Sequence, residues 1–259
     1  MNDILEELAA VRRADAEERE REVSFAEMVR RAESAPEPRD FAAAFRRKGV
    51  NIIAELKRAS PSEGMIREDF RPAELAAELE SAGACALSVL CEPHRFLGDE
   101  AYLREARRVT GLPLLYKDFV TTRWQVAAAR AAGADAVLLI AAVLGDEALG
   151  GLIRFAGELG LAALVETHDR DEISRAVACG AAIVGVNCRN LRDFTTDVSL
   201  LESLVGGIPR PCVRIAESGM HSAGAVARAR AAGADGFLVG TALMRAPSPG
   251  DGLRRMISI

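Results

Sequence analysis

The stretch IIAELKRASPS, from Ile52 to Ser62, decides how the rest of this chain is interpreted. It begins as an apolar run, typical of a buried strand, and then turns polar. Side chains alternate between the two faces of a strand, so Glu55 and Lys57 are expected on one face and Leu56 on the other. Two opposite charges that point inward are costly unless they pair or take part in chemistry. A structural ion pair and a functional pair are equally compatible with this stretch alone.

The chain after Val50 repeats one pattern, in which a helical segment leads through a glycine into a short apolar run. The glycine falls where a helix end needs a left-handed residue, and the links are Ala82-Gly83-Ala84, Ala132-Gly133-Ala134, Cys179-Gly180-Ala181 and Ala232-Gly233-Ala234. Apolar strands that alternate with helices indicate a parallel sheet buried on both faces. The segments 128–142 and 228–242 also resemble each other, which suggests internal repetition.

Strands are expected at about 50–56, 84–90, 112–117, 134–140, 161–166, 181–187, 212–216 and 235–239. Eight such strands with a helix after each one predict an α/β protein, a (β/α)8 TIM barrel. A doubly wound open sheet is the alternative, but no glycine fingerprint follows the first strand. The barrel is the preferred fold.

The first 48 residues differ from the barrel pattern and predict a helical extension. An amphipathic helix is expected from Ile4 into the charged run 12–22, and Ser24 with Glu27 predicts a capping box for a second helix. A third short helix is expected over 39–48. We therefore predict residues 1–48 as an N-terminal extension packed on a barrel of residues 49–259, in a single domain. The extension would seal one barrel end or form a lid over a site.

Composition narrows the class of protein. A length of 259 residues with 49% hydrophobic and 27% charged residues fits a globular chain with a large core. The net charge of −5 gives no reason to expect a nucleic-acid or membrane partner. The five cysteines show no CxxC spacing, so reduced thiols, a cytoplasmic location and no metal site are predicted. The three histidines, His94, His168 and His221, are expected in solvated or helix-capping positions.

Polar residues follow most of the predicted strands, where a barrel places its active site. They are Glu55, Lys57 and Ser60 after the first strand, Lys117 and Asp118 after the third, Glu166 after the fifth, Asn187 after the sixth, Glu217 and Ser218 after the seventh, and Thr241 after the eighth. Ser218-Gly219 and Gly240-Thr241 also offer backbone N–H groups at neighbouring strand ends, which predicts a phosphate site where the two glycines let the ligand approach. A cluster on one rim favours a functional site over a structural role.

These residues bring a known family into view. The stretches 55–62 (ELKRASPS), 114–119 (LLYKDF), 164–166 (LVE), 185–191 (GVNCRNL), 216–219 (AESG) and 237–241 (FLVGT) closely resemble indole-3-glycerol-phosphate synthase of tryptophan biosynthesis. The resemblance covers essentially the whole chain. It implies a (β/α)8 carboxy-lyase that converts 1-(2-carboxyphenylamino)-1-deoxyribulose 5-phosphate to indole-3-glycerol phosphate, CO2 and water. It further implies no cofactor and no metal, a phosphorylated small molecule as the partner, and a monomer or weak homodimer.

The resemblance also implies roles for single residues. Lys117 matches the lysine that protonates the developing alkoxide, and a neighbouring cation or a low dielectric is expected to help it release a proton. Glu166 matches the acid–base residue, and Lys57 matches a second lysine that holds substrate anions or serves as the acid in dehydration. Glu55 and Glu217 are expected to balance the lysines, and Asn187 to fix Glu166 or a substrate hydroxyl.

Binding residues transfer in the same way, in two groups. The phosphate side would comprise Ser60, Arg189, Ser218, Gly219, Gly240 and Thr241. The apolar slot for the anthranilate ring would comprise Pro61, Phe96, Phe119, Leu138 and Leu191.

Two rival functions are compatible with a barrel that binds phosphate. A phosphoribosylanthranilate isomerase would share the phosphate site, but it would lack the Glu-x-Lys-x-x-Ser-Pro-Ser strand and the long N-terminal extension. A non-catalytic relative could bind phosphosugars or a partner enzyme, but the presence of Lys57, Lys117 and Glu166 together argues against that reading. The synthase remains the preferred function.

Overall fold

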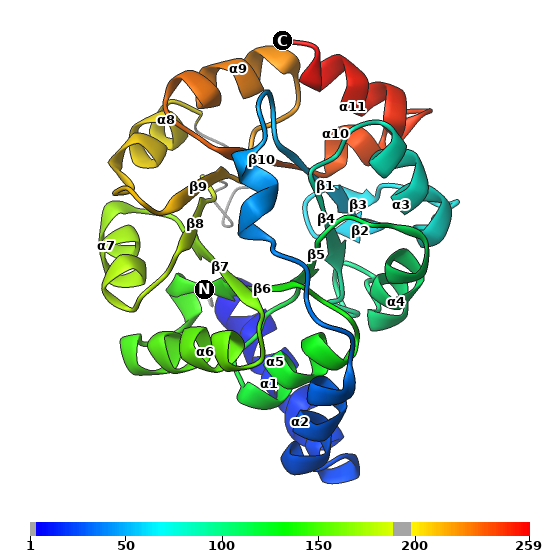
Figure 1. Ribbon diagram of the computed structural model, residues 1–259, viewed down its shortest axis with the longest axis vertical. Coiled ribbons are helices and arrows are strands. Elements are labelled where there is room, and N and C mark those ends of the chain that lie inside the picture. The colour runs from blue at the N-terminus through cyan, green and yellow to red at the C-terminus, as the bar shows by residue number, and fades with distance from the viewer. Residues whose placement is uncertain (1–3, 189–197) are drawn as a thin grey trace.

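Eight parallel strands close into a barrel in the computed structural model, which describes residues 4–188 and 198–259. The order around the barrel is β1-β10-β9-β8-β7-β6-β5-β4, and β4 pairs with β1 to close it (Figure 1). The strands are β1 Ile52–Leu56, β4 Ala86–Leu90, β5 Leu114–Lys117, β6 Ala136–Ile140, β7 Ala162–Thr167, β8 Ile183–Val186, β9 Val213–Ala216 and β10 Gly236–Val239. The predicted (β/α)8 barrel is therefore confirmed.

Helices surround the barrel and join each strand to the next. They are α3 Pro72–Ser81, α4 Glu100–Val109, α5 Arg123–Ala131, α6 Asp146–Glu158, α7 Arg170–Ala178, α8 Val198–Gly207, α9 Ala223–Ala231 and α11 Pro249–Ile257, with the short α10 Thr241–Met244 and the 3-10 turn η2 Ala141–Val143. Side-chain caps start several of them; for example, Thr122 and Gln125 form a capping box on α5. Gly83, Gly133, Gly180 and Gly233 all have φ between 93° and 103°, as the repeated link predicts.

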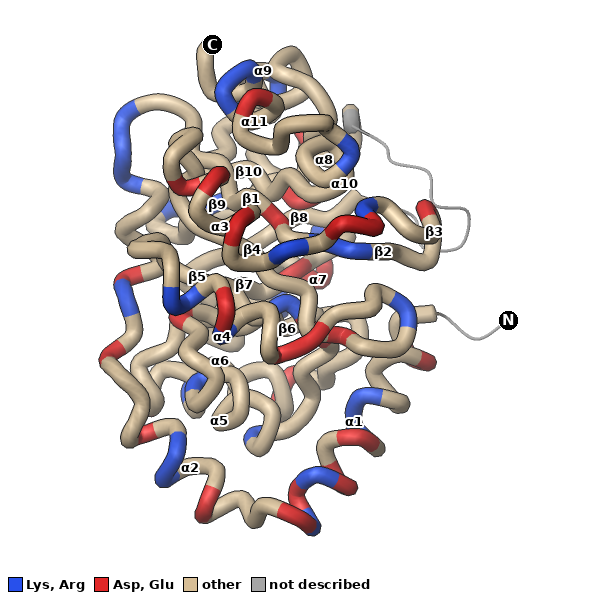
Figure 2. The backbone as a smooth tube through the Cα atoms, turned by 90° about the vertical axis from the view of Figure 1, so that its right-hand side faces the viewer, with Lys and Arg blue, Asp and Glu red and all other residues tan. Residues whose placement is uncertain are grey.

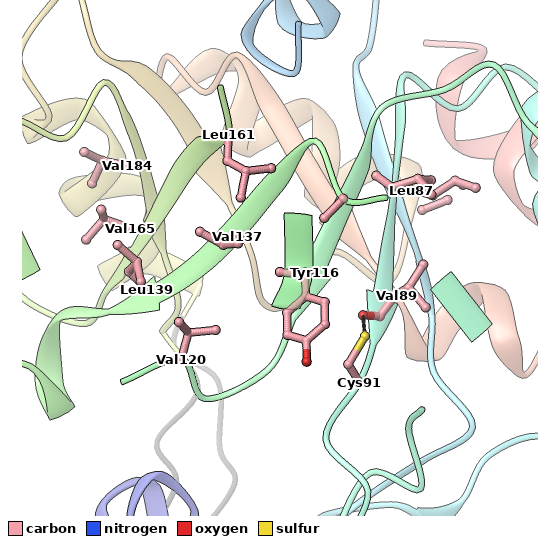
Figure 3. Close-up of a cluster of buried hydrophobic side chains, with 14 of the residues drawn as sticks. Leu87, Val89, Cys91, Tyr116, Val120, Val137, Leu139, Leu161, Val165 and Val184 are labelled. Atoms are coloured by element: carbon pink, nitrogen blue, oxygen red, sulfur yellow. Dashed lines mark hydrogen bonds between the residues drawn. The ribbon is translucent and has the colours of Figure 1, made fainter. Parts of the chain in front are cut away.

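The core has two layers, because strand side chains alternate in direction. Ile53, Leu115, Leu164 and Ile215 belong to the layer that fills the barrel interior. Their neighbours along the strands pack outward under the helices, and Figure 3 shows Leu87, Val89, Tyr116, Val137, Leu139, Val165 and Val184 in this outer layer. The inward layer ends where most of the strands turn polar, and it thereby forms the floor of a site.

The two related segments of the sequence make equivalent hydrogen bonds. The backbone N–H of Asp135 donates to Leu114 O at 2.9 Å, and its carboxylate accepts from Leu114 N at 2.7 Å. Asp235 repeats both bonds with Arg214, at 2.8 and 2.9 Å. Each aspartate thus ties the start of its own strand to the preceding strand, so the sequence repeat is also structural.

The N-terminal extension consists of α1 Ile4–Glu22, α2 Phe25–Ser34 and η1 Ala42–Arg46. Figures 1 and 2 place α1 and α2 at the opposite end of the molecule from α9 and α11, and both signs of charge lie along α1. Ser24 accepts from Glu27 N at 3.4 Å, which is one half of the predicted capping box. The third helix is a 3-10 turn of five residues, shorter than the predicted 39–48, because the chain leaves it at Arg47 in extended conformation.

The extension touches both ends of the barrel, so the two alternatives for it are not exclusive. Phe41 and Phe45 stack edge to face, with ring centroids 5.3 Å apart, and belong to the interior cluster. A Cβ at Gly236, the first residue of β10, would lie 2.5 Å from the Phe45 ring, so η1 packs against the strand starts. Leu5 of α1 instead lies in the cavity at the carboxyl ends of the strands.

Among the described residues, no helix combines the length and the apolar character needed to cross a bilayer.

Candidate active site

A cavity of about 470 Å³ opens at the carboxyl ends of the barrel strands. The strand alternation builds it, because on most strands the inward position after a core residue carries a polar group or a glycine. Ile53 is followed inward by Glu55 and Lys57, Leu115 by Lys117, Leu164 by Glu166, Ile215 by Glu217 and Leu238 by Gly240. Thirteen predicted site residues line the cavity: Glu55, Lys57, Phe96, Lys117, Phe119, Leu138, Glu166, Asn187, Glu217, Ser218, Gly219, Gly240 and Thr241.

Lys117 lies at the centre of the polar cluster. Its Nζ donates to Glu166 Oε2 at 2.9 Å and to Glu217 Oε2 at 3.0 Å. Asn187 Nδ2 donates to the other oxygen of Glu166 at 3.1 Å. The ammonium is thus fixed by carboxylates from two different strands, and one of these carboxylates is itself oriented by an amide.

The charges around Lys117 differ from the expectation. Burial alone would lower the pKa of Lys117, but the charges of Glu166, Glu217 and Glu55 outweigh burial and raise that pKa. Lys117 is therefore an ammonium in the free protein. The expected effect of a low dielectric is thus present, but the three carboxylates outweigh it. An ammonium with a raised pKa can still protonate an alkoxide, which is a far stronger base.

Lys57 and Glu55 form the second ion pair of the cavity, with Nζ and Oε2 2.8 Å apart. Gly240 on the adjoining strand makes room for this pair. A Cβ there would overlap Glu55 Oε2 and would lie 3.1 Å from Lys57 Nζ. The missing side chain of Gly240 therefore leaves space for the Glu55 carboxylate. From the sequence, the same glycine was expected to let a ligand approach the backbone.

Apolar side chains form one wall of the cavity. The rings of Phe96 and Phe119 lie 6.4 Å apart between centroids, and Leu138 and Leu5 line the same space. The loop that carries Phe96 is held by the fully buried Glu92, whose carboxylate accepts from the backbone N–H groups of residues 94, 95 and 96 at 2.7–2.8 Å. An apolar wall of this kind is typical of a pocket that binds a small molecule.

Small residues form the wall at the ends of β9 and β10. Gly219 has φ +76°, a conformation that favours glycine. Ser218 Oγ accepts from Cys188 N at 2.9 Å, which ties the ends of β8 and β9 together. Thr241 Oγ1 is buried without a hydrogen-bond partner among the described residues. A buried hydroxyl of this kind is suited to a polar group of a ligand.

Two predicted binding residues of the described chain do not line the cavity. Ser60 and Pro61 do not line it; they lie in the hairpin in which Ala59–Ser60 (β2) pairs with Gly64–Met65 (β3). Their binding role stays a prediction. Arg189 and Leu191 lie outside the described residues.

The structure adds residues that the sequence did not single out. Leu5, Glu63, Glu92 and Arg245 line the cavity, and Arg245 Nη2 pairs with Glu63 across its edge. Glu92 could have been found, because it follows β4 as the other polar residues follow their strands. Leu5, Glu63 and Arg245 carry no such signal, since they come from a terminal helix, a hairpin and the segment after α10.

A buried network connects α1 to the strand that carries Lys117. Arg12 Nε and Nη2 donate to the two carboxylate oxygens of Asp118, at 2.9 and 2.7 Å. The Tyr116 hydroxyl lies 3.2 Å from a carboxylate oxygen of both Asp118 and Glu100 and can donate its one proton to either, and Arg19 donates to Glu100 at 2.7 Å. Asp118 thus points away from Lys117 and serves to anchor the N-terminal helix.

Solved structures of other proteins share the fold. Thiamine phosphate pyrophosphorylase from Pyrococcus furiosus superposes with a TM-score of 0.61 at 17% identity, over 82% of this chain and 95% of that one. A putative lactate oxidase from Pediococcus acidilactici gives a TM-score of 0.62 at 14% identity, over 86% and 72%. At such identities the likeness concerns the barrel alone.

Sequence relatives are much closer. An indole-3-glycerol phosphate synthase from Aromatoleum aromaticum is 43% identical over 260 residues, which cover 99% of both chains. One from Campylobacter jejuni is 43% identical over 257 residues, which cover 98% of this chain and all of the relative. The family model for indole-3-glycerol phosphate synthase matches residues 5–256. Together with the site at the strand ends, these matches place the chain in the indole-3-glycerol phosphate synthase family.

Proposed function

We propose that this protein closes, decarboxylates and dehydrates 1-(2-carboxyphenylamino)-1-deoxyribulose 5-phosphate, which yields indole-3-glycerol phosphate, CO2 and water. The observation that carries the proposal is Lys117, an ammonium held between two carboxylates at the bottom of a cavity with one apolar and one small-residue wall. The substrate has three matching parts: an aromatic ring with a carboxylate, a ketone and a phosphate.

The apolar wall of Phe96, Phe119 and Leu138 would hold the aromatic ring. Ser218, Gly219 and Thr241 would receive the phosphate at the ends of β9 and β10, where barrels often bind this group. The ketone then lies between the two walls, above the lysines. Holding both ends of the substrate brings the ring carbon close to the ketone carbon. The entropy lost in bringing these two atoms together is then covered by binding and does not add to the barrier of the reaction.

In the first step, the ring carbon that bears the carboxylate attacks the ketone, and Lys117 protonates the developing alkoxide. Loss of CO2 then restores the aromatic ring. In the last step, the new hydroxyl leaves as water and a proton is lost to complete the indole. Lys57, paired with Glu55, is placed to hold the substrate carboxylate or to protonate the leaving hydroxyl. Glu166, oriented by Asn187, is placed for the remaining proton transfers.

The test mixes the purified protein with the substrate and follows the indole fluorescence of the product. We expect wild-type protein to form product and Lys117→Ala to lose about 100-fold or more in kcat, since a positioned general acid contributes about 10²–10⁴-fold. Lys48→Ala is the matched control, because Lys48 is exposed and does not line the cavity. Folded wild-type protein that forms no product would refute the proposal and favour the binding or isomerase alternative.

A further inference from the structure

The ring of His168 lies between two carboxylates, in the turn that follows β7. Nδ1 is 3.0 Å from Glu172 Oε2, and Nε2 is 3.4 Å from Glu166 Oε1. Only 20% of the side chain is exposed, and the ring is not part of the cavity lining. The sequence predicted a solvated or capping histidine, and the structure corrects this. His168 contacts Glu166, a carboxylate that lines the cavity, but does not itself line the cavity.

The orientation of the ring is fixed from the helix that follows. Glu172 lies in the first turn of α7, and its backbone N–H donates to the capping residue Asp169 at 2.8 Å. Glu172 Oε2 also accepts from the backbone N–H of His168 at 2.8 Å. This oxygen is therefore a fixed acceptor for Nδ1–H, and Nε2 is turned toward Glu166.

The distances to Lys117 do not distinguish its two carboxylate partners, at 2.9 Å for Glu166 and 3.0 Å for Glu217. Two buried carboxylates that share one ammonium repel each other, so one of them tends to take up a proton. Their other oxygens differ. Glu166 Oε1 faces Asn187 and His168, whereas Glu217 Oε1 is buried without a hydrogen-bond partner among the described residues.

We propose that His168 is a positioning residue, whose imidazolium keeps Glu166 rather than Glu217 as the ionised carboxylate beside Lys117. The inference rests on the proposed function and deepens it, because it decides which carboxylate is free to accept a proton from the substrate. His168 does not touch the reacting atoms. It acts through Glu166, by a positive charge on the side of the carboxylate that lies away from the cavity.

The electrostatics of the cluster support this division. Burial would lower the pKa of His168, but Glu166 and Glu172 raise it to about 10. Burial would raise the pKa of Glu166, yet Lys117 and His168 hold it well below the usual range. Burial does raise the pKa of Glu217, and the charge of Glu166 adds to that effect against the attraction of Lys117.

Three further charged groups act on the pair of His168 and Glu166: Lys117 from β5, Glu217 after β9 and Glu172 from α7. Asn187 after β8 adds a neutral donor. Removing the imidazolium should therefore raise the pKa of Glu166. The ionised form would then be lost at a higher pH on acidification, and the acid limb of kcat/KM should move upward. The loss of one nearby opposite charge corresponds to about 1–3 pH units.

The first experiment compares pH profiles of kcat/KM for wild type and His168→Gln, which keeps an N–H donor without the charge. His94→Gln is the matched control, because His94 is a half-exposed histidine that also pairs with a carboxylate, Asp15. We expect the acid limb to move upward for His168→Gln and to stay in place for His94→Gln. A folded His168→Gln protein whose acid limb coincides with that of wild type would overturn the proposal.

A second measurement does not depend on turnover. The ¹⁵N resonances of the His168 ring in the wild-type protein, assigned by their loss in His168→Gln, should show both nitrogens protonated at neutral pH. Glu172→Gln should lower the pH at which these ring resonances titrate, and this readout also serves if His168→Gln fails to fold. A neutral ring at neutral pH would overturn the inference. Folded wild-type protein without any turnover would instead refute the proposed function, so the two failures are distinguishable.

Discussion

Gly185 offers a sharp test of how the carboxylate cluster is packed. It lies on β8, and its missing side chain leaves the space that Glu217 occupies. A Cβ built on Gly185 would overlap Glu217 Oε1 and would lie 2.8 Å from Cδ and 3.2 Å from Cγ. Real Cβ atoms do not approach other atoms so closely, so Gly185→Ala must displace the Glu217 side chain from its position beside Lys117.

The displacement should cost both stability and activity. Forcing one extra methyl group into a packed interior typically costs about 1–3 kcal/mol of unfolding free energy. Activity should fall further, because a shift of about 1 Å in a catalytic constellation can cost about 100-fold. Glu217 can give way only into the cavity that it lines, and there it would lose its hydrogen bond with Lys117.

The assay is urea unfolding together with the fluorescence assay for product. Gly157→Ala is the matched control: it lies on α6, a Cβ there meets nothing within 4 Å, and the change should stabilise the helix by about 0.4–1 kcal/mol. The double variant Gly185→Ala/Glu217→Ala removes the overlap, so its destabilisation should be smaller than the sum of the two single changes. Additive free energies, or a Gly185→Ala protein with normal activity, would refute this account of the packing.

Other predictions concern the anchoring of α1 and the strand starts. Arg12→Ala leaves the buried Asp118 without its cation and should destabilise the protein by about 3–5 kcal/mol in urea unfolding, whereas an unchanged midpoint would show that the pair is dispensable. Burial opposes ionisation of Glu100, but Arg19 outweighs it and lowers the pKa of Glu100. The stability from this depressed pKa is therefore present above the unfolded pKa and is lost as the pH falls through the folded value, so Glu100→Gln should flatten stability against pH in the acid range. A slope equal to that of wild type would count against this assignment. Asp135→Ala should cost about 1–3 kcal/mol for each backbone donor it leaves unpaired, which chemical denaturation would measure.

The sequence alone determined the barrel. Each predicted strand coincides with an observed one to within a few residues, because strands buried on both faces must be apolar and most of them end at a glycine or a polar residue. Strand alternation also placed Glu55, Lys57, Lys117, Glu166 and Glu217 on one rim. All strands of a parallel barrel run in the same direction, so their carboxyl ends lie at the same end of the barrel. The length and type of the third N-terminal helix were missed, because a short 3-10 turn is held by packing of Phe41 and Phe45 and carries no periodic signal.

Only the tertiary structure decided which groups face each other. Lys117 meets Glu166 and Glu217, which lie 49 and 100 residues away in the chain, and Arg12 meets Asp118 at a separation of 106. Such pairs depend on the register and closure of the barrel, which no local pattern encodes. The same holds for His168: in the sequence it is one residue of a helix start, whereas in the folded protein it lies behind Glu166, because the turn after β7 and the cap of α7 point its ring inward.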